Sequence, residues 1–168
     1  MDISPFITDI PNFPKEGIIF KDICPLLANP KAFDYVCEQM AVNLDGVDKI
    51  VALDARGFIF GWAVANMLEI PFIPLRKAGK LPGKIESIKY DLEYGSNVFE
   101  IQSDVIQSGD KVAILDDLLA TGGSIIAACS LVEKQGGIVD KIQVLIELEY
   151  LKAREKITDY AIHSMIKY

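Results

Sequence analysis

The stretch from Val112 to Ser124 constrains the fold most, because it joins an apolar run to two carboxylates and a turn of small residues. It reads V-A-I-L-D-D-L-L-A-T-G-G-S. Four apolar residues, two of them β-branched, predict a strand buried on both faces, as in a parallel sheet. We expect this strand to end at Asp116 and Asp117, and the apolar spacing of Ile125 to Lys134 predicts a helix.

The turn from Ala120 to Ser124 has the composition of an anion-binding site. Its glycines let the backbone approach a ligand, and helix N-terminal amides and hydroxyls can bind phosphate oxygens. Asp116 and Asp117 would repel phosphate, so their expected partners are sugar hydroxyls or a divalent cation. Gly123 stands where a nucleotide-binding P-loop has its lysine. The sequence favours a ribose phosphate; the alternative is an ordinary strand-to-helix turn.

Composition limits the classes of partner. A chain of 168 residues, 51% hydrophobic, can bury one substantial core, so we expect one domain over residues 1–168. A net charge of −7 provides no basic surface for nucleic acid or anionic lipid. The apolar runs are strand-sized, and the amino terminus lacks a signal-peptide pattern. We therefore expect a soluble cytoplasmic protein with no nucleic-acid or membrane partner.

Cysteine and histidine are too sparse for a structural zinc site. Cys24, Cys37 and Cys129 are widely spaced without a Cys-x-x-Cys motif, and His163 is the one histidine. Largely buried thiols in a reducing compartment are expected. His163 lies in an alternating segment and is interpreted as a strand or surface residue.

A second strand-turn-helix unit precedes the central stretch. Lys49 to Leu53 predicts a buried strand, Asp54 to Gly57 a turn, and Phe58 to Leu68 a helix. Ligands bind at the carboxyl ends of strands in such sheets, so the two turns are expected to share one cleft. Arg56 offers a planar fork of donors for phosphate oxygens, although a surface ion pair would also explain it.

The remaining segments fit an α/β chain with two special regions. Ile10 to Leu27 is broken by prolines and a glycine, which predicts neither a long helix nor a plain strand. Arg76 to Lys84 follows a strand over Pro71 to Leu75 and predicts a mobile basic loop able to close on an anion. The other expected elements are a helix over Phe33–Leu44, a hairpin over Ser87–Tyr94 and Asn97–Gln102, strands over Ile138–Glu147 and Tyr160–Lys167, and a short helix over Leu151–Lys156.

Four ordered motifs resemble the type I phosphoribosyltransferases, and their form is similar to that of adenine phosphoribosyltransferases. They are D-A-R-G-F-I-F-G from Asp54, R-K-A-G-K-L-P-G from Arg76, Y-D-L-E-Y-G from Tyr90 and D-D-L-L-A-T-G-G from Asp116. The resemblance covers about Ile10 to Glu155. It implies a single-domain, mainly parallel twisted sheet flanked by helices, with an N-terminal arm and hood (about 1–30) and a flexible basic flap and hairpin (about 77–102).

The resemblance also implies a reaction and a set of site residues. Adenine and phosphoribosyl diphosphate (PRPP) would give AMP and diphosphate with Mg²⁺ carried mainly by PRPP, without direct protein ligands, in a homodimer. The implied catalytic residues are Glu93, Asp116, Asp117 and Arg56; the 5′-phosphate residues are Ala120, Thr121, Gly122, Gly123 and Ser124; the diphosphate residues are Asp54, Ala55, Arg56, Arg76, Lys77, Lys80 and Tyr94; the adenine residues are Ile19, Phe20 and Lys21. A strained, even cis, bond between Asp54 and Ala55 is implied as well.

Two alternatives share the phosphate motif. A 6-oxopurine or xanthine phosphoribosyltransferase would lack the Y-D-L-E-Y-G hairpin. A non-enzymatic PRPP-sensing regulator would usually need a nucleic-acid-binding face, which this acidic chain does not offer.

Overall fold

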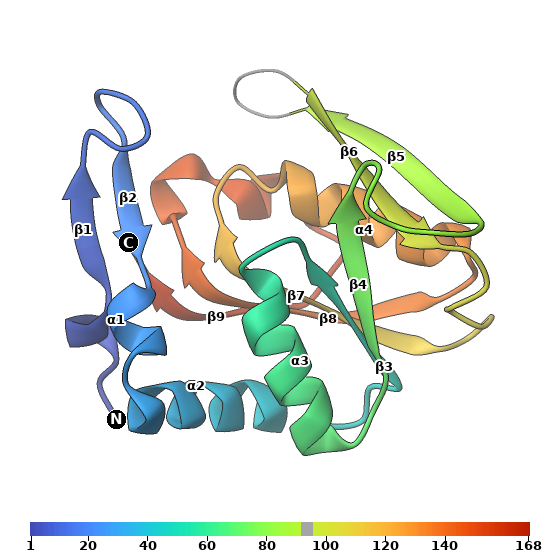
Figure 1. Ribbon diagram of the computed structural model, residues 1–168, viewed down its shortest axis with the longest axis horizontal. Helices are drawn as coiled ribbons and strands as arrows, with labels where there is room; N and C mark the ends of the chain where they lie inside the picture. The colour runs from blue at the N-terminus through green and yellow to red at the C-terminus, as the bar shows by residue number, and fades with distance from the viewer. Residues whose placement is uncertain (92–95) are drawn as a thin grey trace. The chain divides into compact units, whose positions relative to one another are not determined.

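The computed structural model describes residues 1–91 and 96–168, which divide into two compact units (Figure 1). The first unit is Met1–Met40 and the second is Ala41–Tyr168. Each is built around its own sheet, and each is described by itself below. The predicted limits of the hood and the flap stay predictions.

The N-terminal unit contains a small antiparallel sheet. The strands β1 (Thr8–Pro11) and β2 (Ile19–Asp22) pair from Thr8 with Asp22 to Pro11 with Ile19. The segment from Ile10 to Leu27 is therefore neither a long helix nor one plain strand, as predicted, because it contains the end of β1, all of β2 and α1 (Cys24–Leu27). Its prolines did not prevent pairing, because Pro11 ends β1 and Pro14 lies in the connecting loop. The unit also contains η1 (Ser4–Phe6) and most of α2 (Pro30–Asn43).

Helix α2 begins earlier than the periodicity predicted. The side chain of Asn29 accepts a hydrogen bond from the amide of Ala32 at 3.1 Å, and Pro30 occupies the first turn. A capping asparagine followed by proline is a favourable helix start, since proline lacks an amide that would need a partner there. Cys24 in α1 is exposed, so the expectation of largely buried thiols holds only for Cys37 and Cys129.

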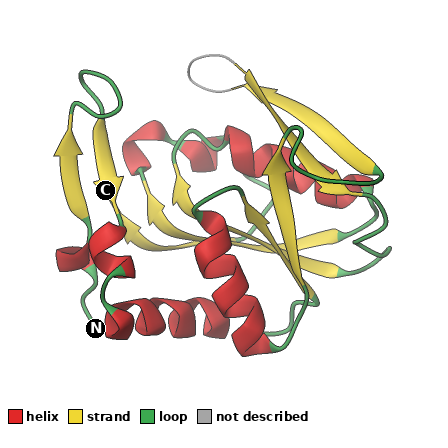
Figure 2. Cartoon of the chain, in the orientation of Figure 1, coloured by secondary structure: helices red, strands yellow, loops and turns green. Residues whose placement is uncertain are grey.

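The second unit is a seven-stranded sheet with helices, shown by element type in Figure 2. Its strand order is β5-β6-β4-β3-β7-β8-β9, parallel from β4 to β9, with β6 antiparallel to β4 and to β5. The elements are β3 (Lys49–Leu53), α3 (Gly57–Leu68), β4 (Phe72–Lys77), β5 (Ile85–Asp91), β6 (Ser96–Gln102), β7 (Lys111–Leu119), α4 (Gly123–Lys134), β8 (Ile138–Glu147), η2 (Glu149–Leu151), η3 (Ala153–Glu155) and β9 (Ile162–Lys167).

The centre of this sheet is buried on both faces, as predicted. Residues 112–115 of β7 are fully buried and pair in parallel with β3, from Lys49 with Val112 to Ala52 with Leu115. The helices α3 and α4 lie on opposite faces of the sheet (Figure 1). Right-handed crossovers explain this arrangement, because β4 and β8 flank the β3–β7 pair on opposite sides.

Two predicted boundaries and one predicted helix were wrong. Strand β7 continues through Asp116 and Asp117 to Leu119, because β8 pairs with it over that length. Arg76 and Lys77 belong to β4 and not to the loop, because β6 pairs with both. The helix expected over Leu151–Lys156 is replaced by the 3₁₀ turns η2 and η3, which Lys152 separates with a φ of 53°. Within the described ranges, no helix is long and apolar enough to span a membrane.

Candidate active site

The two predicted turns meet at one cavity of about 510 Å³. From β3 the chain first runs outward to β4, and it returns to the other side of β3 as β7. A reversal of strand order of this kind opens a crevice at the carboxyl ends of the strands. The residues around the cavity are Leu53, Asp54, Ala55, Arg56, Lys77, Tyr90, Asn97, Phe99, Asp116, Asp117, Leu118, Ala120, Thr121, Gly122 and Ser124.

The N-terminus of α4 supplies backbone donors to this cavity. Gly122 is the N-cap residue with a φ of +87°, a backbone conformation that residues other than glycine rarely adopt. Its carbonyl accepts a hydrogen bond from the amide of Ile126 at 3.0 Å. The first amides of an α-helix have no intrahelical acceptor, and the helix dipole adds partial positive charge there. This turn can therefore hold an anion of the size of a phosphate.

Gly57 lets the first turn of α3 approach the carboxylate-bearing end of β7. A Cβ at Gly57 would lie 2.9 Å from Oδ1 of Asp116 and 3.0 Å from the carbonyl oxygen of Leu115. No larger residue fits without moving β7 or the helix, so this glycine fixes how the two turns meet.

The carboxylate pair and Arg56 form the polar centre of the cavity. Asp117 is 4% exposed, and its Oδ2 lies 2.8 Å from Nη2 of Arg56. Burial first, and then the charge of Asp117, raises the pKa of Asp116 well above the ordinary value. Burial also raises the pKa of Asp117, against the opposing effect of Arg56. Binding partners that donate hydrogen bonds, such as sugar hydroxyls, would favour the ionised forms.

Asp54 forms ion pairs with two cations of the basic segment, Arg76 and Lys80. Its Oδ2 lies 3.1 Å from Nζ of Lys80 and 3.4 Å from Nε of Arg76. Burial acts to raise the pKa of Asp54, but the hydrogen bond and charge of Lys80, with Arg76 and the Lys77 amide, lower it overall. The peptide bond from Asp54 to Ala55 is cis, as the sequence resemblance implied.

Sequence reasoning missed the wall that the hairpin contributes. The rings of Tyr90 on β5 and Phe99 on β6 stack with centroids 4.5 Å apart, and Asn97 pairs with Tyr90 across the hairpin. All three residues line the cavity. The alternation of Ile88 and Tyr90 with Phe99 and Ile101 on one face of a two-stranded ribbon was the signal that could have found them.

Comparison with known proteins identifies the family. Residues 26–166 match the family model described as a phosphoribosyl transferase domain. The adenine phosphoribosyltransferase of Mesomycoplasma hyopneumoniae is 52% identical over 167 residues, covering 99% of this chain and 98% of that protein. The chain belongs to the adenine phosphoribosyltransferase family.

Solved structures of adenine phosphoribosyltransferases share the fold. That of Thermoanaerobacter pseudethanolicus has a TM-score of 0.96 at 50% identity, covering 99% of this chain and 98% of that chain. That of Saccharomyces cerevisiae, complexed with D-2,5-dideoxy-2,5-imino-altritol 1,6-bisphosphate and adenine, has a TM-score of 0.93 at 39% identity, covering 97% and 96%. The fold class expected from the sequence is confirmed.

The residues that the family resemblance singled out fall into four groups, the last of which is the set of adenine candidates. Most line the cavity: Asp54, Ala55, Arg56, Lys77, Asp116, Asp117, Ala120, Thr121, Gly122 and Ser124. Arg76 and Lys80 contact Asp54, and Gly123 begins α4 beside a neighbouring pocket. Glu93 and Tyr94 lie outside the described residues.

The adenine candidates of the family lie on β2 in the N-terminal unit. Ile19 is exposed and Phe20 is half-buried, with its ring packed edge-on against Phe13 at 5.2 Å. Lys21 is buried and pairs with Asp9 at 2.7 Å. Their role in binding adenine stays a prediction.

Phosphoribosyltransferases, the family to which this chain belongs, generally use Mg²⁺ with PRPP. Among the described residues, no group of three or more His, Cys, Asp or Glu side chains could hold a metal ion. Mg²⁺ often binds through only one or two carboxylates, with substrate phosphates and water completing its shell. The half-buried carboxylate of Asp116, which lines the cavity, is suited to such a metal–substrate complex.

Proposed function

We propose that this chain transfers the 5-phosphoribosyl group of PRPP to N9 of adenine, giving AMP and diphosphate, in purine salvage. The observation that carries the proposal is the convergence of two features on one cavity. A helix N-terminus and a carboxylate pair lie on one strand-turn-helix unit, while Arg56 and Lys77 reach the same cavity from other strands. This is the layout that a sugar bearing an anion at each end requires.

The 5′-phosphate and the ribose of PRPP each have a proposed binding partner. The 5′-phosphate binds at Ala120 to Ser124, through backbone amides at the start of α4 and the hydroxyls of Thr121 and Ser124. Asp116 and Asp117 accept hydrogen bonds from the 2′ and 3′ hydroxyls. Binding of the phosphate and the ribose hydroxyls places the anomeric carbon in one position, so that reaction with adenine no longer depends on random encounter.

The proposed chemistry follows from where charge develops. As the bond from the anomeric carbon to diphosphate breaks, the ribose becomes cationic and the leaving group gains negative charge. The carboxylates of Asp116 and Asp117 favour the cationic ribose, and Arg56, Arg76, Lys77 and Lys80 favour the departing diphosphate. Mg²⁺, held by PRPP oxygens, would neutralise part of the diphosphate charge.

The residues that contact the base are also proposed. Ile19, Phe20 and Lys21 are the candidates for adenine contact, Glu93 is proposed to manage the proton on the imidazole ring, and Tyr94 is proposed to contact the diphosphate. These assignments rest on the sequence motifs. Glu93→Gln should lower kcat more than PRPP affinity, and equal losses in both would leave Glu93 only a positioning role.

A base-specificity assay tests the proposed function. The purified protein is incubated with PRPP, MgCl₂ and either adenine, hypoxanthine, guanine or xanthine, and nucleotide products are separated by chromatography. AMP with stoichiometric diphosphate is expected, and chelation of Mg²⁺ should abolish it. Faster formation of an oxopurine nucleotide would favour the 6-oxopurine or xanthine alternative. PRPP binding without turnover of any base would favour a regulator.

We propose that the protein forms a homodimer in the cytoplasm. In support, helix α3 exposes Ile59, Trp62 and Met67, with Trp62 62% exposed, and such apolar surface commonly forms interfaces. Light scattering should give twice the chain mass, and Trp62→Glu should shift it to monomer. The buried thiols of Cys37 and Cys129, whose pKa values burial raises to about 12, are consistent with a reducing compartment.

A further inference from the structure

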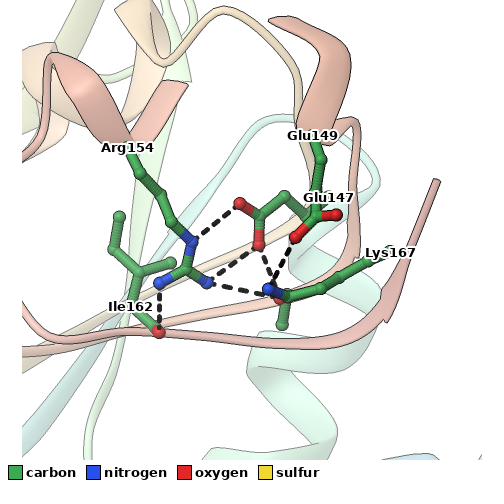
Figure 3. A network of polar contacts seen from close by, with 6 residues as sticks. Glu147, Glu149, Arg154, Ile162 and Lys167 are labelled. Atoms are coloured by element: carbon green, nitrogen blue, oxygen red, sulfur yellow. Dashed lines mark hydrogen bonds and ion pairs between the residues drawn. The ribbon is translucent and has the colours of Figure 1, made fainter. Parts of the chain in front are cut away.

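An ion pair between a buried carboxylate and a partly exposed guanidinium, Glu147 and Arg154, lies outside the residues that line the cavity (Figure 3). Glu147 is the last residue of β8, and its side chain is 4% exposed. Arg154 in η3 donates from Nε to Oε1 at 2.7 Å and from Nη2 to Oε2 at 2.8 Å. This two-point geometry fixes the orientation of the guanidinium as well as its distance.

Further bonds fasten the same pair to β9. The hydroxyl of Ser164 donates to Oε2 of Glu147 at 2.6 Å, and Nη1 of Arg154 donates to the carbonyl of Ile162 at 3.1 Å. The hydrogen bond from Arg154 is the main cause that lowers the pKa of Glu147, with burial opposing it and Ser164 adding to it. The carboxylate is therefore ionised, and η3 is fixed to the ends of two strands.

The segment that Arg154 fixes packs against the proposed phosphate turn. A Cβ placed on Gly122 would lie 2.9 Å from Cδ1 of Ile157 and 3.4 Å from Cβ of Ala153. Ala153 and Ile157 are 2% and 3% exposed. Arg154 lies between them in sequence, so its bonds to Glu147 and Ile162 restrain the segment that carries this apolar surface.

The second connection runs through the sheet. Leu119 pairs with Glu147 across β7 and β8, and the amide of Leu148 donates to the carbonyl of Leu119 at 2.9 Å. Leu119 directly precedes the phosphate turn. The turn is thus held at its start by the strand that bears Glu147 and at Gly122 by the segment that bears Arg154.

We propose that Glu147 and Arg154 are positioning residues that set the geometry of the 5′-phosphate-binding amides. They touch no substrate; the ion pair holds Ala153 and Ile157 under Gly122 and so keeps the amides at the start of α4 aimed at the phosphate. This inference rests on the proposed function, because it assumes that the phosphate binds at residues 120–124.

The test is Arg154→Lys in the full-length protein, which keeps the charge but loses the two-point fork. A 1 Å misplacement can cost about 100-fold in rate, so a smaller shift of the amides should raise the KM for PRPP about tenfold. The KM for adenine and the kcat at saturating PRPP should change less than threefold, about the spread of context effects. A purely structural role would instead lower the active fraction, and hence kcat, without changing the KM for PRPP.

Two further variants sharpen the result. Glu149→Gln is the matched control, because Glu149 also pairs with a cation at 2.7 Å, Lys167, but its side chain is 55% exposed whereas that of Glu147 is 4% exposed. It should leave the KM for PRPP unchanged. Ile157→Val removes Cδ1, which lies 2.9 Å from a Cβ built at Gly122, and should also raise the KM for PRPP, by a smaller factor. It also serves as the test should Arg154→Lys fail to fold.

Calorimetric binding of ribose 5-phosphate distinguishes failure of the proposed positioning role from failure of the proposed phosphate site. If the wild type binds it and Thr121→Ala weakens binding, but Arg154→Lys and Ile157→Val bind it as the wild type does, the positioning role is overturned and the proposed function stands. If the wild type fails to bind ribose 5-phosphate, or Thr121→Ala has no effect, the phosphate assignment itself is wrong. Weaker binding in both positioning variants, with normal binding by Glu149→Gln, supports the inference.

Discussion

Nη2 of Arg56 lies 2.8 Å from Oδ2 of Asp117, although Arg56 follows β3, Asp117 lies on β7 and the two residues are far apart in the chain. The pair joins the turn after β3 to the end of β7. It brings a donor suited to diphosphate beside a carboxylate suited to the ribose. The groups proposed to stabilise the leaving group and the cationic sugar are thus in direct contact.

Asp117→Asn should lower kcat by about 100-fold, the loss typical of removing one preorganised electrostatic group. The amide keeps the shape of the side chain but removes the negative charge that favours the cationic ribose. Steady-state kinetics at saturating substrates measures the effect, with circular dichroism to verify folding. Asp140→Asn, a partly exposed carboxylate on β8 that does not line the cavity, is the control. A rate near that of the wild type would remove Asp117 from the mechanism.

Gly122→Ala should weaken PRPP binding and destabilise the protein. An L-residue at a φ of +87° costs about 1–2 kcal/mol, and here the added Cβ also meets Ile157 at 2.9 Å. Gly46→Ala is a matched control, since Gly46 has a φ of +83° but no atom within 4 Å of the added Cβ. Urea denaturation should show both variants destabilised, whereas only Gly122→Ala should raise the KM for PRPP. An equal effect of the two on KM would contradict the proposed role of the turn.

The basic loop between β4 and β5 should become protected from trypsin when PRPP and Mg²⁺ bind. Lys80 and Arg76 pair with Asp54, and diphosphate offers both cations a stronger anionic partner. Mass spectrometry of partial digests should show slower cleavage after Lys80 and Lys84. Cleavage after Lys152, an exposed residue between η2 and η3, should be unchanged. Equal rates at Lys80 with and without PRPP would argue against loop closure.

The ion pair of Glu147 should make part of the stability pH-dependent. Its pKa in the folded protein lies below the ordinary glutamate value of about 4.3, so the folded state favours the ionised form. The resulting stabilisation is fully present above that value and is lost as pH falls through the lower pKa of the folded protein. Urea denaturation from pH 7 to pH 3 should therefore show the wild type and Glu147→Gln converging at low pH. Glu149→Gln serves as the control, and a difference that is constant with pH would contradict the ionised pair.

Contiguous features were predictable from the sequence because their signals are local. The buried run before Asp116, the small-residue turn and the apolar period of α4 follow one another in the chain, and burial and helix periodicity identify them directly. The predicted end of β7 was wrong because β8 pairs with it beyond the apolar run. The local sequence of one strand does not show where its partner strand ends.

The sequence by itself determined the fold class, the two strand-turn-helix units and the residue types that suit a ribose phosphate. Only the tertiary structure decided which of them meet: Asp117 with Arg56, Asp54 with Lys80, and Tyr90 with Phe99. It also paired Glu147 with Arg154 beneath Gly122. The physical reason is that local residue patterns fix the type of each element, whereas strand order and register fix which side chains lie within contact distance.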